Sequence, residues 1–190
     1  MITIIGEYIR NYVDFSDKEI ELFYQYLTKQ KLKKKGFLLE EGKMCKARYF
    51  IVKGCLRSYY IDDKGVERIV DFAIDRWWYT NYKSLVNQEP SENFIQAIEN
   101  TELLVLHEDS FNKLSLELPK IDRLFRLIME KTHIAYINKM KYTRSFTGED
   151  LYKNFIKANP KFSQRVPQYM IASYLELSPE FVSKIRAKDR

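Results

Sequence analysis

The chain has 190 residues, of which 45% are hydrophobic and 15% aromatic, enough for a core in one large domain with a smaller one beside it. No apolar run approaches the roughly 18 residues of a membrane span, and no signal-peptide pattern opens the chain, so we expect a cytoplasmic protein without a membrane partner. The net charge of +6 lies entirely between residues 139 and 190, where 11 Lys and Arg accompany 5 Asp and Glu. This concentration favours a polyanionic partner, and a solvated basic helix face is the alternative.

The first part of the chain divides into a helical stretch and a β region. Residues 1–28 have helical spacing, and Ser16 with Glu19 three positions later is typical of a capping box. From about residue 30 to residue 106, short aromatic and β-branched runs alternate with glycines. The clearest predicted strands are residues 48–52, 56–61, 68–74, 94–98 and 103–106. The sequence Asp62-Asp63-Lys64-Gly65 predicts a hairpin turn, and the whole region predicts an antiparallel sandwich or barrel.

Helical spacing returns after His107, with a short helix capped near Ser110 and a long one from Pro119 to about Tyr142. The long helix carries two apolar stripes, whereas a helix on a monomer surface needs only one. A seven-residue recurrence of apolar positions favours pairing of two such helices. The predicted pairing residues are Ile121, Leu124, Ile128 and Ala135. The alternative is a single helix buried in a groove of its own chain.

These elements predict an α+β fold in three parts. We expect residues 1–118 to form an antiparallel β domain with N-terminal helices, residues 119–144 to form a dimerisation helix, and residues 145–190 to form a small helical domain. The Asn159-Pro160 pair separates the helices of that last domain.

Residues 168–190 carry the most informative pattern in the chain. Their apolar positions fall at the spacing of two short helices that cross at a tight turn, as in a helix-turn-helix. Ser178 and Pro179 are a typical start for the second helix, because serine caps it and proline needs no donor there. Glu176 occupies the turn position where glycine is common because its φ is often positive, which costs a non-glycine residue about 1–2 kcal/mol.

The second helix is therefore predicted to enter the DNA major groove. Glu180 can accept from cytosine, Lys184 can donate to guanine, and Ser183 can bond a base or a phosphate. Gln168, Tyr169 and Ser178 lie at helix starts, where phosphates are held. Further phosphate contacts or merely solubilising charges are expected at Arg186, Lys188 and Arg190. The complete predicted DNA-binding set is Gln168, Tyr169, Ser178, Pro179, Glu180, Ser183, Lys184 and Lys188.

In the order of its elements the chain resembles the Crp/Fnr family of bacterial transcription regulators. The stretches that carry the resemblance are residues 40–65, with the turn glycines Gly42 and Gly54, and residues 165–188. The resemblance implies a cyclic-nucleotide-binding-like β-roll and a homodimer that binds a palindromic site on double-stranded DNA. It also suggests RNA polymerase as a partner. Contacts from the β-hairpin wing that some relatives add after this helix are not expected.

The resemblance does not extend to the family's phosphate-binding cassette, which pairs Gly-Glu with a downstream Arg-Ser. The matching residues 77–96 contain neither glycine nor arginine, and Lys83 is their only cation. Because a desolvated phosphodiester needs a paired positive charge, we expect no cyclic AMP binding of the usual kind. Two cysteines, Cys45 and Cys55, are too few for the four thiolates of an iron–sulfur cluster, and a reduced pair is expected.

Other functions have weaker support in the sequence. An enzyme or a metal-binding cupin would need convergent histidines and carboxylates, but His107 and His133 lie on different elements, so no catalytic residue, metal or cofactor is expected. The main alternative is a ligand-sensing roll whose terminal helices bind a protein instead of DNA. An aromatic cluster is either core filling or a pocket for an unknown small-molecule effector, and it comprises Trp77, Trp78, Tyr79 and Tyr82.

Overall fold

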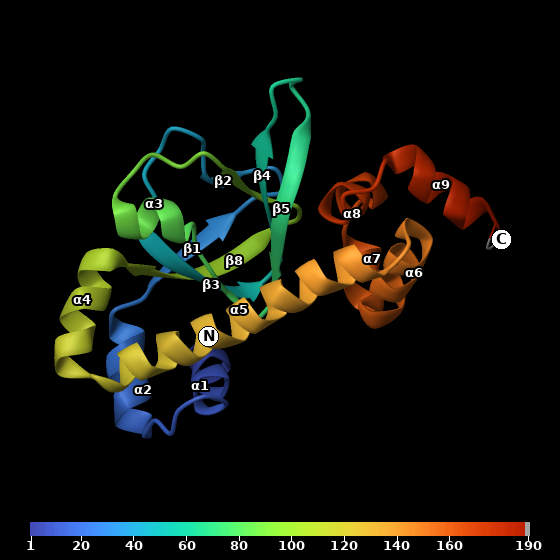
Figure 1. Ribbon diagram of the computed structural model, residues 1–190. Helices are drawn as coiled ribbons and strands as arrows, with labels where there is room; N and C mark the ends of the chain where they lie inside the picture. The colour runs from blue at the N-terminus through green and yellow to red at the C-terminus, as the bar shows by residue number, and fades with distance from the viewer. Residues whose placement is uncertain (189–190) are drawn as a thin grey trace.

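The computed structural model describes residues 1–188 as an α+β protein, in which a β-roll and a terminal helical domain flank one long helix (Figure 1). Its strands are β1 (Thr28–Leu32), β2 (Phe37–Leu39), β3 (Ala47–Lys53), β4 (Cys55–Ile61), β5 (Glu67–Ile74), β6 (Trp78–Tyr79), β7 (Phe94–Ala97) and β8 (Thr101–His107). Its helices are α1 (Ile2–Arg10), α2 (Asp17–Gln25), α3 (Tyr82–Asn87), α4 (Glu108–Glu117), α5 (Lys120–Ser145), α6 (Gly148–Ala158), α7 (Pro160–Arg165), α8 (Gln168–Tyr174) and α9 (Pro179–Lys188).

The roll consists of two four-stranded antiparallel sheets. Their strand orders are β1-β8-β3-β6 and β2-β7-β4-β5, and their inner faces enclose a core that includes Leu56, Ile95 and Leu103. The predicted hairpin turn joins β4 to β5, with the amide of Asp62 bonded to the carbonyl of Val66 and Gly65 at a φ of 75°. The β3–β4 turn requires glycine for two reasons. Gly54 has a φ of 130°, and a Cβ there would lie 2.7 Å from Cα of Thr101.

A second core joins the first sheet to the helices at the N-terminal end of α5. Phe50 and Leu104 of the sheet pack with residues of α1, α2 and α4 and with the first turns of α5. The predicted capping box begins α2, because the Ser16 hydroxyl accepts from the Glu19 amide and the Glu19 carboxylate accepts from the Ser16 amide. The carboxylate also pairs with Lys120 on α5, and these contacts lower the pKa of Glu19 to about 2. The predicted cap of α4 was wrong, since His107 and not Ser110 precedes that helix.

The terminal domain, α6 to α9, packs on the outer face of the second sheet. Cys55, Ile69 and Phe72 of β4 and β5 share a third core with Ile171, Leu175 and other residues of the terminal domain. In addition, the amide of Ile69 donates to the hydroxyl of Ser173, at 3.0 Å. Figure 1 places α8 directly beside β5. The helix α8 therefore rests on the roll itself. None of the helices in residues 1–188 has the length and apolar character needed to cross a bilayer.

Candidate nucleic-acid interface

The two terminal helices form the tight corner that the sequence predicts. Leu177 donates its amide to the Ala172 carbonyl, at 2.9 Å, and Glu176 between the helices has a φ of 60°, as expected for a position that favours glycine. The hydroxyl of Ser178 accepts from the Phe181 amide at 3.1 Å, so it caps α9. Pro179 follows as the first residue of the helix.

One face of α9 is buried and the rest is open to solvent. Val182 and Ile185 pack into the third core, and this packing fixes the orientation of the helix. Glu180, Ser183 and Lys184 are all exposed, and none forms an ion pair with another described residue. Lys188 is also exposed but lies 3.8 Å from a Glu149 carboxylate oxygen of its own domain. The predicted position Arg190 lies outside the described residues.

A groove of about 350 Å³ separates the start of α8 from α9, and we call it the recognition groove. It is lined by Gln168, Tyr169, Pro179, Val182, Ser183, Arg186 and Ala187. Four residues of the predicted DNA-binding set therefore meet here, while Glu180 and Lys184 are exposed on the same helix without lining the groove. Gln168 is fixed in place, since its amide oxygen accepts from the Tyr152 hydroxyl at 2.6 Å.

The aromatic residues predicted as an effector pocket are spread over different surroundings. Trp77 is 51% exposed, whereas Trp78 packs edge-on against Phe125, with ring centroids 5.0 Å apart, in the core beneath α5. Tyr79 packs in the roll interior, and burial raises the pKa of its hydroxyl above the ordinary value. Core filling, which was the alternative explanation, accounts for Trp78 and Tyr79. Burial also raises the pKa of Tyr82, which bonds to Arg48.

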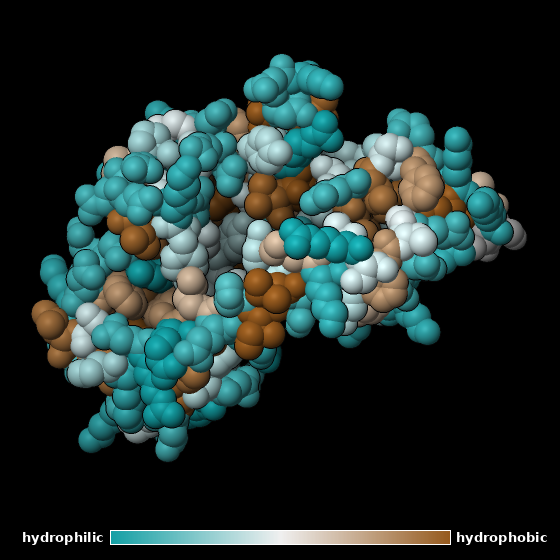
Figure 2. Space-filling model, viewed as in Figure 1, coloured by the Kyte–Doolittle hydropathy of each residue, from teal (hydrophilic) through white to brown (hydrophobic). Residues whose placement is uncertain are grey.

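The predicted dimerisation residues also need correction. Ile121, Leu124 and Ile128 are buried against the helices and sheet of their own chain, so they are unavailable to a second copy. Ala135 is exposed. Here the alternative, a helix lying in a groove of its own chain, describes the first turns of α5. From residue 129 to residue 138 α5 is exposed on every side, and Figure 2 shows a hydrophobic patch over its middle.

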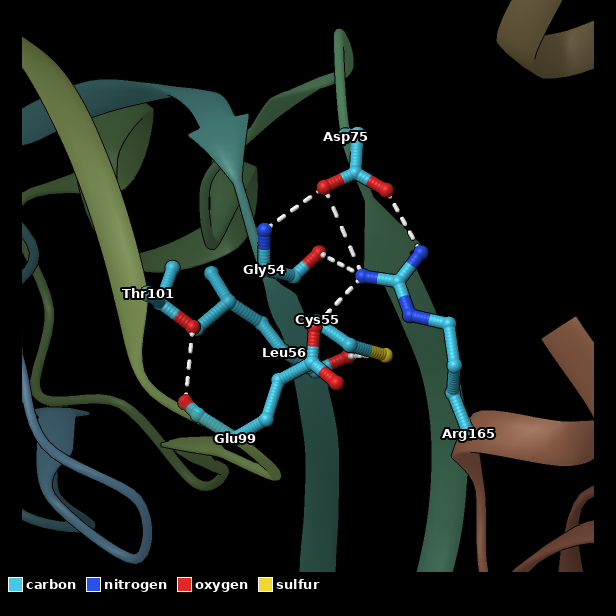
Figure 3. Close-up of polar contacts among 7 residues, drawn as sticks. All are labelled: Gly54, Cys55, Leu56, Asp75, Glu99, Thr101 and Arg165. Carbon is cyan, nitrogen blue, oxygen red and sulfur yellow. Dashed lines mark hydrogen bonds and ion pairs between the residues drawn. The ribbon is translucent and has the colours of Figure 1, made fainter.

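Sequence reasoning missed a polar cluster that joins the terminal domain to the roll, which we call the Arg165 clamp (Figure 3). Arg165, the last residue of α7, donates to Asp75 at 2.5 Å, to Glu99 at 2.5 Å and to the Gly54 carbonyl at 2.9 Å. Asp75 also accepts from the Gly54 amide, at 2.6 Å. One guanidinium thus bridges the β3–β4 turn, the end of β5 and the loop after β7.

The clamp changes the pKa of Asp75. Burial alone would raise the pKa of Asp75, but hydrogen bonds from Arg165 and from the Gly54 amide outweigh it and leave the pKa below its ordinary value. Cys55 lies beside the clamp, and burial raises the pKa of its thiol to about 12. Both cysteines are buried and unpaired, and residues 1–188 contain no group of three potential metal-ligating side chains.

Comparison with known proteins supports the fold of the β-roll. Residues 29–117 match the sequence family described as the cyclic nucleotide-binding domain. FixK2 from Bradyrhizobium japonicum has a similar structure, with a TM-score of 0.72, 17% identity and coverage of 85% of this chain and 83% of that one. The global regulator CLP from Xanthomonas campestris, described as responsive to c-di-GMP, gives a TM-score of 0.75 and 13% identity, with 91% of each chain covered.

The catabolite activator protein of Thermus thermophilus is also similar, with a TM-score of 0.57, 18% identity and coverage of 93% of this chain and 84% of that one. At these identities the similarity establishes the fold. Because each alignment covers most of this chain, it includes elements beyond the roll. No curated protein matches the sequence.

Proposed function

We propose that this chain is a dimeric, DNA-binding transcription regulator of the Crp/Fnr type that inserts α9 into the major groove and does not depend on cyclic AMP. The observation that carries the proposal is the exposed face of α9. It presents Glu180, Ser183 and Lys184 from a helix whose N-terminus is capped and whose other face is buried. Base readout needs such side chains near the N-terminus of a rigid helix.

Charge supports DNA over a protein as the partner. The entire positive excess of the chain lies in residues 139–190, which include the terminal domain. Arg186 lines the recognition groove together with Tyr169, and Lys184 is exposed two residues nearer the helix start. Phosphates bind to cations and to the amides at helix starts, so this groove suits a DNA backbone next to the bases that α9 contacts.

Dimerisation would use the exposed stretch of α5. Ile134 is 60% exposed and Ile137 is 49% exposed, although both are large and apolar. Together with the half-buried Leu127 they recur at spacings of seven and three, on a different face from the buried Ile128. That spacing is typical of the apolar positions at which two helices pair in a coiled coil. A second copy paired along this face would cover side chains that are costly to leave in water.

The proposed independence from cyclic AMP rests on the region that matches the family's phosphate cassette. Its single cation, Lys83, extends into solvent from α3 and pairs with Glu92, with a nitrogen–oxygen distance of 2.6 Å. The roll interior beside it is filled by apolar and aromatic side chains such as Leu85 and Tyr79. A cyclic phosphodiester would therefore lack a desolvated cation at this position.

A selection experiment tests the proposal. The purified chain is incubated with a pool of random duplexes, bound duplexes are amplified, and the affinity of the enriched sequence is measured by fluorescence anisotropy over a range of salt concentrations. We expect enrichment of a two-fold symmetric sequence and a steep loss of affinity as salt rises. No enrichment, and no retardation of any duplex at low ionic strength, would leave the terminal helices as a protein-binding module.

A further inference from the structure

A second groove lies between the roll and the terminal domain, next to the recognition groove. Its volume is about 440 Å³, and its lining includes Lys34, Lys35, Arg57, Glu99, Arg165 and Tyr169. Four cations and one carboxylate give this surface a net positive charge. We call it the interdomain groove. The proposed contacts between α9 and the DNA bases do not involve this groove.

The two lysines differ from the two arginines in what they contact. Arg57 is buried and engaged with Glu67 and Gln96, and Arg165 is engaged in its clamp. Lys34 and Lys35 are exposed on the turn between β1 and β2, and neither forms an ion pair with another described residue. Their charges are thus free to meet a ligand, whereas the charges of both arginines are already compensated by carboxylates.

The backbone of this turn is held firmly in place. The Lys34 amide donates to the Asn100 side chain at 2.9 Å, and the Lys35 amide donates to the Ala97 carbonyl at 2.8 Å. The Lys35 carbonyl accepts from the Gln96 side chain at 3.0 Å. Lys35 has a φ of 68°, a strained conformation that glycine would adopt freely. A lysine at a position that suits glycine carries a backbone cost, which is consistent with a role for its side chain.

The interdomain groove and the recognition groove share one lining residue. Tyr169 is 53% exposed and lines both of them, so the two lysines lie on the path that leads from the start of α8 onto the roll. The Arg165 clamp and the third core hold the roll and the terminal domain together along this path. The positions of Lys34 and Lys35 relative to α9 are therefore fixed.

We propose that Lys34 and Lys35 contact the phosphates of DNA that flank the sequence under α9, so that the roll itself forms part of the DNA interface. This inference rests on the proposed function and extends it. Duplex DNA leaving the recognition groove carries a phosphate on each strand about every 3.4 Å, so flanking phosphates pass any cationic surface beside α8. The contacts carry no base specificity, because lysine meets phosphate as a point charge.

The test compares two double variants of equal charge. Lys34→Ala with Lys35→Ala removes the proposed contacts, and Lys43→Ala with Lys64→Ala removes two exposed lysines from other turns of the roll. Affinity for the selected duplex is measured as a function of salt. Each lost phosphate contact should reduce the slope of log K against log salt by about 0.9, so the first variant loses about 1.8 per chain and the control keeps the wild-type slope.

Duplex length provides the second arm. Wild-type affinity should rise when the duplex is extended beyond the selected sequence, and the Lys34/Lys35 variant should not respond to the extension. A single Lys35→Gly variant, which relieves the positive φ, guards against a folding defect and should show about half of the slope change.

The outcomes separate this proposal from the previous one. If the wild type binds no duplex, the proposed function fails. If it binds DNA but both double variants share its slope and its response to length, only the present proposal is overturned. A thermal-shift titration with inorganic pyrophosphate completes the comparison. Stabilisation that depends on Lys34 and Lys35, with an unchanged DNA slope, would assign the groove to a small anion and overturn the proposal.

Discussion

Replacing Arg165 with Ala should weaken the attachment of the terminal domain to the roll. The substitution removes a guanidinium that donates to Asp75, Glu99 and the Gly54 carbonyl, and it leaves two carboxylates without their shared counter-charge. The apolar contacts of the third core remain, since none of them involves the arginine. The variant should therefore fold, but with lower stability and a looser terminal domain.

The size of the effect follows from the exposure of the three side chains. Arg165 is 27% exposed, and its partners Asp75 and Glu99 are 37% and 35% exposed. Ion pairs on the surface contribute about 0–1 kcal/mol, whereas breaking a buried pair costs about 3–5 kcal/mol. A cluster between these limits should lose about 2 kcal/mol, which for a chain of this length lowers the Tm by about 4–8 °C.

Urea unfolding followed by tryptophan fluorescence measures this loss, and hydrogen exchange in α8 and α9 reports the loosening. A double-mutant cycle with Glu99→Gln isolates the pairwise contribution, because that carboxylate has Arg165 as its side-chain partner. We expect a coupling of about 1 kcal/mol. If Arg165→Ala stays within about 0.5 kcal/mol of the wild type and leaves exchange in α8 unchanged, the clamp does not hold the domains together.

Three further outcomes are expected. Lys184→Ala should lower affinity for the selected duplex by about 5- to 100-fold while non-specific binding changes little, and equal losses on both DNAs would show that Lys184 contacts only phosphate. Ile134→Lys combined with Ile137→Lys should convert the proposed dimer to a monomer in sedimentation equilibrium, whereas a variant that stays dimeric would refute pairing along that face of α5. Because the pKa of Asp75 is lower in the folded chain than in the unfolded one, the free energy of unfolding should fall as the pH drops below about 3.8. Asp75→Asn should flatten that dependence in acid unfolding curves, and an unaltered curve would mean that other carboxylates cause it.

The tight corner between α8 and α9 was predictable because local contacts determine it. Ser178 and Pro179 begin α9 through contacts within one helical turn, and Glu176 has a positive φ for the same local reason. The longer strands were likewise predicted to within about one or two residues, since alternation and turn residues mark them. By contrast, β1 was missed, because its polar sequence TKQKL has no apolar alternation and it forms only by pairing with β8.

What could not be predicted depends on contacts between distant parts of the chain. Two apolar stripes were visible on α5, but only the folded chain decides that Ile121 and Ile128 pack against the roll while Ile134 remains exposed. The Arg165 clamp joins positions separated by 66 to 111 residues. No local sequence pattern around this arginine, which precedes Val-Pro, predicts these contacts. Similarly, the sequence alone does not show that Lys34 and Lys35 lie in one groove with Tyr169.

Hydroxyl-radical footprinting of the selected duplex tests most directly whether two α9 helices occupy DNA together. We expect two symmetric protected patches whose centres are about one helical turn, roughly 34 Å, apart, with the protection weakened in both by Lys184→Ala. A single patch that responds to none of the α9 substitutions, or a duplex with no protection at saturating protein, would contradict a paired recognition helix as the DNA-reading element.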